Sequence, residues 1–522
     1  MNGASDPQPR RDRTLALVAQ NLTGRYLSIV VDGAIGLVML PFNVSHLGSS
    51  AYGLWALTTS VTWFFGVLDL GYGAALVKFI AQYKAWRNDS ALNEILSTIG
   101  TIFAGIGLFC FAVTVAMAWR IDSLFNIAPE QVPTARDVLL ITGALLSVRF
   151  AFSIFGAVVY GFNESYRNDV VTVVTSLVVA GVNVAVLLSG HGLVPLVAAT
   201  TVIRALSLGA SAWNAYQVFP GMHVRPSLFR RGRLKEVTGF SVYMLVLDWS
   251  AKLNYSADAL VIGVFLNTAA IAVWTIGQRL AQLAQQITNQ LNDSLFPAVV
   301  DSDAARHHER LQLILVQGIK LSLALAAPLC LGLIMMADSL VHAWVGSKFA
   351  GSVVPLQIML TVVLVRASTS SANLILKGAG QHRLLAFTNA ATAVVNVALS
   401  IILIRPLGLN GVALGTLLPV SFSAVFVLYP AACRRVGVPV HRPIVEAIGP
   451  ALWPAAVMAG ALRLADHVPP VNLADVALRL VVAGLVYVAL FVGVAIGAEE
   501  RRFYWTKLCA VLRRGERVAA TL

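Results

Sequence analysis

The sequence contains the stretch VRFAFSIFGAVVYG at residues 148–161, and a related stretch, VRASTSSANLILKG, follows at residues 365–378. The two share the pattern Val-Arg-x3-Ser-x7-Gly, and each lies in a long apolar run. A second pair of identical stretches, VNVA, stands at 182–185 and at 395–398. Internal repeats with a substrate site at their interface are typical of secondary transporters. The sequence therefore predicts a duplicated membrane bundle with an arginine near the middle of one helix in each copy.

The composition is that of a membrane protein. Of the 522 residues, 57% are hydrophobic and 12% are charged, and the mean hydropathy is +0.76, whereas soluble domains carry about 25% charged residues. Apolar runs long enough to cross a hydrocarbon core of ~30 Å recur along the chain, and in lipid each of them must be helical. We therefore predict an all-α polytopic membrane protein with about fourteen transmembrane helices.

The predicted spans are 22–42, 54–77, 95–119, 138–160, 170–189, 193–216, 238–264, 270–297, 312–337, 352–376, 384–405, 411–432, 444–465 and 476–497. Span 270–297 is rich in glutamine and asparagine, so it can be a helix only where its polar face lines protein or water.

The repeat divides the chain into six segments. They are a cytoplasmic N-terminal segment (1–21), an N-lobe of six helices (22–216), a basic cytoplasmic linker (217–237), a C-lobe of six helices (238–432), two further helices (433–497) and a basic cytoplasmic tail (498–522). Because each lobe has six helices, both lobes enter the membrane in the same direction. We expect a central cleft between them that opens to either side in turn.

The placement of charge predicts the orientation. With the N-terminus in the cytoplasm, most of the 38 Lys and Arg residues fall on the cytoplasmic side, above all in 225–235, 434–442 and 501–517, as the positive-inside rule requires. An even number of spans leaves both termini there. The basic tail is expected to contact anionic lipid rather than nucleic acid. The first thirteen residues are polar, which argues against a cleavable signal peptide.

Ionisable side chains inside the predicted spans are the candidates for function, because each is costly to place in lipid. Arg149 and Arg366 come first, since both lie deep and both belong to the repeat. A salt bridge between the lobes or a packing role is the alternative for this pair. Three more cations are predicted to face a cavity: Arg25, Lys252 and Arg279. The alternative for Arg25 is that its side chain extends to the inner membrane interface.

Two acidic residues, Asp32 and Asp248, are the predicted counter-charges or ion-coupling sites. Asp248 and Lys252 are four residues apart and could instead neutralise each other as a structural pair. All nine histidines fall in loops or near helix ends, which argues against a histidine proton relay. The four cysteines have no paired spacing, and no nucleotide-binding, metal-binding or nucleophile motif occurs. We therefore predict no cofactor, no metal and no enzyme activity.

Several short motifs resemble those of bacterial polysaccharide-export flippases, which belong to the multidrug/oligosaccharidyl-lipid/polysaccharide (MOP) exporter superfamily. They are LGSSAYGLW at 47–55, LDLGYG at 68–73, DALVIGVFL at 258–266, WVG at 344–346 and GLNGVA at 408–413. Their order and spacing extend the resemblance over nearly the whole chain.

The resemblance implies two six-helix lobes around a cationic cavity, with two C-terminal helices added. It implies a polyprenyl-diphosphate-linked oligosaccharide as the substrate, moved from the cytoplasmic to the outer leaflet by alternating access during exopolysaccharide, O-antigen or capsule biosynthesis. The five cations named above would contact the diphosphate or the sugar. Expected partners are the lipid-linked saccharide, membrane lipids and the polysaccharide polymerase or export machinery. The expected location is the bacterial cytoplasmic (inner) membrane.

Three alternatives remain at this point. A multidrug antiporter of the same superfamily would have twelve helices and an acidic cavity, which the arginine-rich interior disfavours. A membrane polysaccharide polymerase or ligase would need a large external loop with catalytic Arg or His, and none is predicted. A lipid II flippase is a sister family, and the motifs at 47–55 and 68–73 favour exported polysaccharide over it.

Overall fold

The computed structural model describes residues 8–69, 71–235, 237–238, 257–465, 472–497 and 500–502. Regular structure within these ranges is helical, without a strand. Eleven helices there are long and apolar enough to cross a membrane. The chain is thus an all-α, multi-pass membrane protein, as the composition predicts.

Two compact units make up the chain. The first comprises residues 1–276 and 400–412, and the second comprises residues 277–399 and 413–522. The lobe boundaries at 216 and 238 were predicted from the sequence repeat, which is a different criterion from compactness. They remain a prediction.

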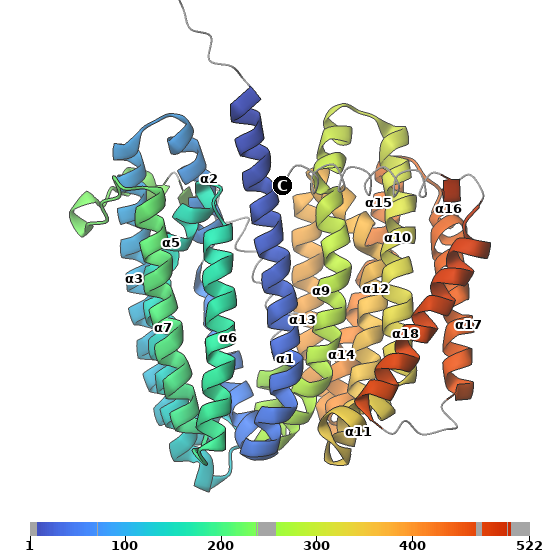
Figure 1. Ribbon diagram of the computed structural model, residues 1–522, viewed down its shortest axis with the longest axis horizontal. Helices are drawn as coiled ribbons and strands as arrows, with labels where there is room; N and C mark the ends of the chain where they lie inside the picture. The colour runs from blue at the N-terminus through green and yellow to red at the C-terminus, as the bar shows by residue number, and fades with distance from the viewer. Residues whose placement is uncertain are drawn as a thin grey trace, which may run out of the picture. The chain divides into compact units, whose positions relative to one another are not determined.

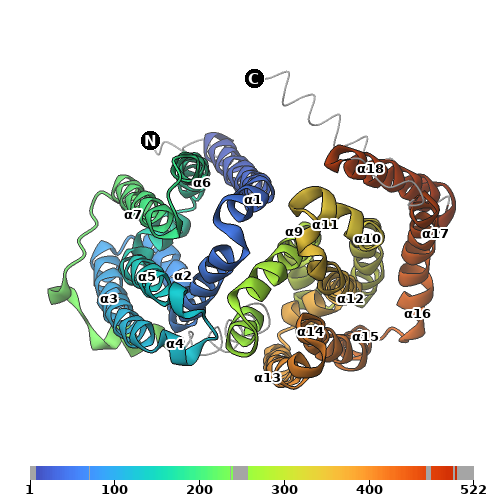
Figure 2. The ribbon, with the colours of Figure 1, turned by 90° about the horizontal axis from the view of Figure 1, so that it is seen from below.

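The first unit contains α1 (Gln8–Phe65), η1 (Gly66–Asp69), α2 (Tyr72–Ala85), α3 (Asp89–Trp119), α4 (Ile121–Leu124), η2 (Pro129–Gln131), α5 (Val132–Gly161), α6 (Tyr166–Leu188), α7 (Leu193–Val218), η3 (Pro226–Leu228), a helical segment at 257–265 and the start of α9 (Thr268–Ala304). Helices α3, α5 and α7 pack side by side, and α1 runs along α6 (Figures 1 and 2). This arrangement places α1, α5, α6 and α7 around the charged residues described below.

The core of the first unit lies between α2, α3 and α5. Its centre is formed by fully buried apolar side chains such as Ile80 on α2, Ile95 and Phe103 on α3, and Val158 on α5. These side chains have no accessible surface. Burying an aliphatic side chain of this size contributes roughly 1.5–3 kcal/mol, so this core fixes α5 and the residues it carries.

The predicted span 54–77 is not one helix. Helix α1 ends at Phe65, a 3-10 turn follows, and α2 begins at Tyr72 after Gly71, whose φ is 73°. Glycine takes this left-handed conformation at little cost. Asp69 stands in the break, where its Oδ1 accepts a hydrogen bond from the backbone N–H of Gly73 at 3.2 Å. The apolar run hid the interruption because the residues at the break are themselves largely apolar.

Helix α1 is itself composed of two helices. The backbone at Gly48 has φ 80° and ψ 163°, so the chain kinks there. The segment before the kink covers the predicted span 22–42, and the segment after it opens the predicted span 54–77. These breaks explain why the count of eleven spans and the predicted count of fourteen differ in this part of the chain.

The second unit contains the rest of α9, α10 (His308–Met335), α11 (Ala337–Val345), η4 (Ser347–Ser352), α12 (Val353–Gly378), most of α13 (His382–Leu407) and α14 (Leu409–Phe422), η5 (Ser423–Leu428), α15 (Tyr429–Val436), α16 (His441–Pro443), η6 (Ile444–Ile448), α17 (Gly449–Ala465), α18 (Leu473–Leu490) and η7 (Phe491–Ala495). Residues 400–412, which end α13 and begin α14, belong to the first unit. Helix α10 is central, because it packs against α12, α17 and α18. The two C-terminal helices therefore attach to this unit through α10.

The structure does not test whether two of the predicted spans cross the membrane. Span 238–264 lies largely outside the described residues. Span 270–297 falls inside α9, which is helical as predicted but is not among the eleven apolar helices. The exact count of fourteen therefore stays a prediction.

The repeated sequence pattern corresponds to equivalent positions in the two units. Ser153 on α5 and Ser370 on α12 each donate a hydrogen bond to the carbonyl three residues earlier. Gly161 and Gly378 each end their helix at a close contact. A Cβ added at Gly161 would lie 2.5 Å from Ile80 Cγ2, and one added at Gly378 would lie 2.6 Å from Val299 Cγ1. The glycines are repeated because both helix ends are closely packed.

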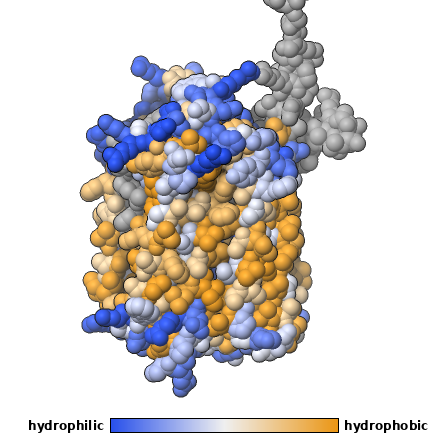
Figure 3. All heavy atoms as spheres, turned by 90° about the vertical axis from the view of Figure 1, so that its left-hand side faces the viewer, coloured by the Kyte–Doolittle hydropathy of each residue, from blue (hydrophilic) through white to orange (hydrophobic). Residues whose placement is uncertain are grey.

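The face of the first unit drawn in Figure 3 carries a broad apolar band with hydrophilic side chains at both ends. Exposed side chains on α3 and α7 contribute to the apolar surface of this unit, among them Phe109, Leu206 and Trp213. Such a band is too large for a soluble surface. It matches the hydrocarbon core of a bilayer.

Candidate functional site

Three charged side chains on three helices form an electrostatic group in the first unit. Arg204 on α7 lies within electrostatic range of Arg149 on α5 and of Asp32 on α1. Arg149 and Arg204 are exposed, and Asp32 is half-buried. Two arginines with one carboxylate leave a net positive charge within helices long and apolar enough to span a membrane. We call Asp32, Arg149 and Arg204 the arginine group.

The arginine group contains two of the seven predicted site residues. Arg204 was not predicted as a site residue, although it falls inside the predicted span 193–216 as a lone cation. The signal for it was therefore present in the sequence. What the sequence did not give was the packing of α7 against α5 and α6, which brings Arg204 near Arg149.

A buried carboxyl group lies at the start of α6. The side chain of Asp169 is only 9% exposed, and its Oδ2 has no hydrogen-bond partner among the described residues. Helix α1 covers this carboxyl closely, because a Cβ added at Gly24 would lie 3.2 Å from Oδ2. The predicted cation Arg25 is the next residue on α1. It is exposed and lies within electrostatic range of Asp169.

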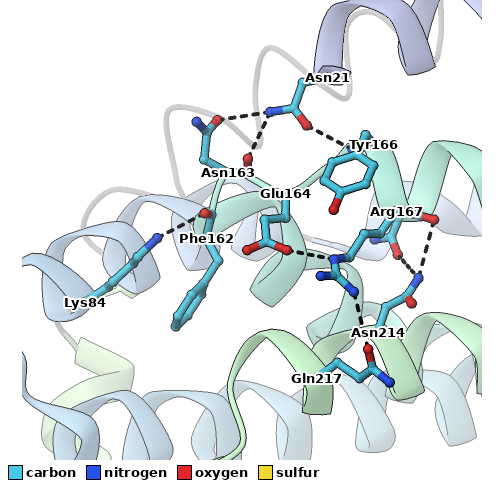
Figure 4. Close-up of polar contacts among 10 residues, drawn as sticks. Asn21, Lys84, Phe162, Asn163, Glu164, Tyr166, Arg167, Asn214 and Gln217 are labelled. Atoms are coloured by element: carbon cyan, nitrogen blue, oxygen red, sulfur yellow. Dashed lines mark hydrogen bonds and ion pairs between the residues drawn. The ribbon is translucent and has the colours of Figure 1, made fainter. Parts of the chain in front are cut away.

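Asn21 ties α1 to the turn that precedes α6 (Figure 4). Its Nδ2 donates to the carbonyl oxygen of Asn163 at 2.9 Å, and its Oδ1 accepts from the backbone N–H of Tyr166 at 3.0 Å. Tyr166 is the first residue of α6, so Asn21 satisfies a donor that the helix cannot satisfy itself. One amide side chain thus fixes the position of α1 one turn before Gly24.

Further polar contacts hold the same turn on its other side (Figure 4). Lys84 Nζ donates to the carbonyl oxygen of Phe162 at 3.0 Å and lies 4.4 Å from the centre of the Phe162 ring. Burial lowers the pKa of Lys84, and the carboxylate of Glu164 opposes this shift. Arg167 donates to Glu164 at 2.6 Å. The turn between α5 and α6 is therefore held by α1 and α2.

A second polar network lies around the start of α9, within the first unit. Ser50 Oγ is 2.9 Å from Thr268 Oγ1, and both hydroxyls are within hydrogen-bond distance of Gln131 Oε1, at 3.0 and 3.3 Å. Gly53 allows this contact, because any Cβ there would collide with the carbonyl of Thr268. Asn126 adds a backbone hydrogen bond to the carbonyl of Gly263 at 2.9 Å.

The second unit carries its own intramembrane cations. Arg279 on α9 and Arg366 on α12 are half-buried, and each has an interaction with another group. Lys320 in the middle of α10 is 5% exposed. Its Nζ lies 3.0 and 2.9 Å from the two carboxylate oxygens of Glu500. Gln317 Nε2 donates to the same carboxylate at 2.8 Å.

Glu500 is held in its charged form by these donors. Its burial acts to raise its pKa, but the hydrogen bonds from Lys320 and Gln317 and the charge of Lys320 together lower the pKa. Lys320 is therefore neutralised by a residue that follows α18. Lys320 falls inside the predicted span 312–337, and nothing in the sequence indicates Glu500 as its partner.

The remaining predicted site residues, Lys252 and Asp248, lie outside the described residues. Of the other five, the structure brings Arg149 and Asp32 together and places Arg25 beside Asp169. Arg279 and Arg366 lie in the second unit. Their roles as substrate contacts stay predictions. Over the described ranges, no three His, Cys, Asp or Glu side chains come close enough to hold a metal ion.

The sequence profile of a family described as polysaccharide biosynthesis proteins matches residues 46–354. Two Haloferax volcanii proteins are similar to the chain. The probable low-salt glycan biosynthesis flippase Agl15 is 21% identical over 41% of this chain and 44% of its own length. The probable flippase AglR is 19% identical over 82% of this chain and 86% of its own length.

A third relative is the uncharacterized membrane protein EpsK of Bacillus subtilis, 26% identical over 30% of both chains. The alignments with Agl15 and EpsK thus span less than half of those proteins.

Solved structures share the fold. The lipid II flippase MurJ in an inward closed conformation superposes with a TM-score of 0.71, at 13% identity, over 90% of this chain and 98% of MurJ. An inward-facing multidrug resistance MATE family transporter of the MOP superfamily gives a TM-score of 0.63, at 16% identity, over 78% of this chain and 98% of its own. The chain therefore has the fold that these two transport proteins share.

Proposed function

Because the chain belongs to the family of polysaccharide biosynthesis proteins, we propose that it is a flippase for a lipid-linked oligosaccharide. The substrate would be a polyprenyl-diphosphate-linked saccharide, translocated from the cytoplasmic to the outer leaflet of the bacterial inner membrane for polysaccharide biosynthesis. Both termini would be cytoplasmic. The names of Agl15 and AglR, both probable flippases, support the class of activity.

The observation that carries the proposal is the arginine group. A diphosphate head group cannot cross a hydrocarbon core unless its charge is compensated, because burial of unpaired charge is very costly. Arg149 and Arg204 provide two guanidinium groups within helices that can span the membrane, and guanidinium groups bind phosphate oxygens in bidentate geometry. When no substrate is bound, the negative charge of Asp32 reduces the electrostatic repulsion between Arg149 and Arg204. The prenyl tail can stay in lipid throughout.

This chemistry needs no covalent step. The saccharide lipid enters and leaves unchanged, so the protein acts by binding and by a change of access, as in other secondary transporters. Arg366, Arg279, Arg25 and Lys252 are proposed as further contacts for diphosphate or sugar. Asp248 is proposed as a counter-charge. A polysaccharide polymerase and export machinery are the proposed downstream partners.

The test is deletion of the coding gene in the native host, followed by complementation. We expect the deletion to abolish surface polysaccharide and to leave the lipid-linked saccharide on the cytoplasmic leaflet. The variants Arg149→Ala and Arg366→Ala should each reduce export at unchanged membrane abundance, and Arg149→Lys should retain part of it. Arg463→Ala, which removes an exposed arginine at the end of α17, is the matched control.

Three results would contradict the proposal or the role it gives to the arginines. Normal export by the double variant Arg149→Ala/Arg366→Ala would exclude the central-cation mechanism. Unchanged saccharide lipids together with new sensitivity to cationic drugs would indicate a multidrug antiporter instead. A loss of protein from the membrane would assign the two arginines to packing.

A further inference from the structure

The segment 219–235, which follows α7, is packed onto the core of the first unit. Figure 1 shows it in green beside the adjoining ends of α3 and α7. Its apolar side chains belong to the core between α2, α3 and α5, and they are Phe219, Met222, Val224 and Leu234. The polar side chains of the same segment are therefore left on its outer side.

Three polar side chains in the first turns of α3 bind the backbone of this segment. The contacts are Asn93 with the carbonyl of Gly221 and the N–H of His223 (2.9 and 2.8 Å), Ser97 with the N–H of Arg225 (3.1 Å) and Thr98 with the N–H of Arg230 (3.0 Å). Asn93 and Ser97 are four residues apart, so they lie on one face of the helix. A loop that a rigid element positions in this way typically presents functional side chains.

The outer side of the segment is strongly cationic. Residues 225–235 contain no Asp or Glu and five cations, which are Arg225, Arg230, Arg231, Arg233 and Lys235. Glu94 on α3 forms ion pairs with two of them, at 3.2 Å to Arg233 and 3.8 Å to Arg230. The other three are exposed, and their side chains form no ion pair within the described part of the chain. Glu236 follows, outside the described residues.

Holding these like charges together costs electrostatic free energy. The fixed backbone prevents the segment from spreading them apart, and Glu94 compensates only part of the charge. An anion that binds from outside removes the remaining repulsion, so the platform favours an anionic partner.

An aromatic side chain borders the cationic surface. Arg233 donates to the hydroxyl of Tyr83 on α2 at 2.8 Å, and the Tyr83 ring lies edge-on to Trp86, with the ring centres 5.7 Å apart. Trp86 is 62% exposed. Tryptophan is enriched where a membrane helix meets the head groups of the lipid. Both α3 and α7 are long and apolar enough to span a membrane, and the segment lies at their ends.

We propose that Arg225, Arg231 and Lys235, together with Trp86, form a docking site for the phosphate groups of anionic phospholipids. We call these four residues the basic platform. The lipids are those of the leaflet at this end of the helices, which the charge distribution predicts to be cytoplasmic. Guanidinium groups bind phosphate oxygens with two parallel hydrogen bonds, and a tryptophan ring fits the adjoining interface. The proposal does not depend on the proposed flippase function.

The basic platform differs from a diffuse attraction between a basic loop and a negative membrane. Diffuse attraction depends only on the number of charges near the surface. A docking site also requires that the charges be held in place, and the side chains of α3 supply that positioning. Changing the charges and changing the positioning therefore test two separate parts of the proposal.

The first experiment changes the charges. Purified full-length protein in a nonionic detergent is titrated with short-chain phosphatidylglycerol, and hydrogen exchange is followed at residues 221–235. We expect phosphatidylglycerol to slow this exchange and phosphatidylcholine of the same chain length to leave it unchanged. Arg225→Gln/Arg231→Gln should raise the half-maximal concentration about fivefold for each removed cation. Arg306→Gln/Arg310→Gln, which removes two exposed cations near the start of α10, should not change it.

The second experiment keeps every charge and changes the positioning. Ser97→Ala/Thr98→Val removes the acceptors for the N–H groups of Arg225 and Arg230. It should weaken phosphatidylglycerol binding about as much as the loss of one cation. Because both hydroxyl-bearing side chains are buried, Asn93→Ala is measured beside it. Asn93 is only half-buried, and its removal should produce a smaller weakening in the same direction.

Four results would overturn the proposal. Exchange at 221–235 that does not respond to phosphatidylglycerol would exclude the site, and an equal response to phosphatidylcholine would exclude recognition of the phosphate charge. Wild-type binding by both positioning variants would leave only diffuse attraction. Loss of polysaccharide export by Arg225→Gln/Arg231→Gln, with unchanged phosphatidylglycerol binding, would assign the basic platform to an acidic protein partner instead. The titrations need no transported substrate, so they decide the proposal even if the flippase function fails.

Discussion

The ammonium group of Lys320 lies between the two carboxylate oxygens of Glu500, at 3.0 and 2.9 Å. This ion pair joins the middle of α10 to the chain that follows η7. Because the Lys320 side chain is 6% exposed and that of Glu500 is 31% exposed, the pair is better shielded from water than a surface pair. Breaking a buried pair is costly chiefly because one charge is left without a partner.

The first prediction concerns the pH dependence of this pair. The pKa of Glu500 is lowered in the folded protein from an ordinary value of 4.5, so its contribution to stability is fully present above pH 4.5 and is lost as the pH falls through the lowered value. We expect Glu500→Gln to reduce the free energy of unfolding by about 2 kcal/mol at neutral pH and to remove this acid-dependent loss. Thermal unfolding in detergent, measured over a range of pH, gives both the loss of stability at neutral pH and its dependence on acid.

A matched control is Glu446→Gln. Glu446 also pairs with a cation, Arg442, but both side chains are about half exposed, and exposed pairs contribute roughly 0–1 kcal/mol. An equal effect of the two substitutions would show that the Lys320–Glu500 pair is no stronger than a surface pair.

The second prediction concerns the repeated glycines. Gly161→Ala and Gly378→Ala should each destabilise the protein by about 1–3 kcal/mol, because the new methyl group would meet the branched side chain of Ile80 or Val299. Gly181→Ala on α6 is the control, since nothing lies within 4 Å of its Cβ position, and alanine there should stabilise the helix by up to about 1 kcal/mol. Thermal unfolding distinguishes the signs of these effects. A neutral result at 161 and 378 would contradict the close packing of both helix ends.

The third prediction concerns Asn21. Asn21→Ala removes two hydrogen bonds to the turn before α6 and should cost about 1–2 kcal/mol, with faster hydrogen exchange confined to residues 163–166. Asn93 makes the same kind of double contact elsewhere, to the carbonyl of Gly221 and the N–H of His223. Asn93→Ala should therefore increase exchange at 221–223 and leave 163–166 unchanged. Exchange that rises at both places in either variant would indicate global destabilisation instead.

The fourth prediction concerns the arginine group. Asp32→Asn leaves Arg149 and Arg204 without their counter-charge and should lower stability, while Arg204→Gln in the same chain should recover part of the loss. We expect a coupling of about 1 kcal/mol in this double-mutant cycle. Independent effects of the two substitutions would show that the charges do not interact across α1 and α7.

The sequence predicted the parts of this structure that depend on periodicity and repetition. The repeated pattern placed Arg149 and Arg366 at equivalent positions in α5 and α12. It also included the glycines at which these two helices end. The break at Gly71 was not predicted, because hydropathy is averaged over a window much longer than the short interruption between α1 and α2. Arg204 and Asp169 were missed as site residues because their significance depends on which helices pack together. For Asp169 the sequence also favoured a loop end over a buried position.

The polar side chains along α9 have a consequence for biosynthesis. This helix lies in the predicted span 270–297 yet falls short of the apolarity of the other long helices, because Gln278, Gln282 and Gln285 interrupt it. A segment of this kind gains too little from lipid to leave the translocation channel by itself. Its integration should wait until α10 and α12 have emerged from the ribosome and can accept its polar face. The order of synthesis would thus set the order of assembly, and the second unit would be the last part of the chain to become resistant to quality-control proteolysis.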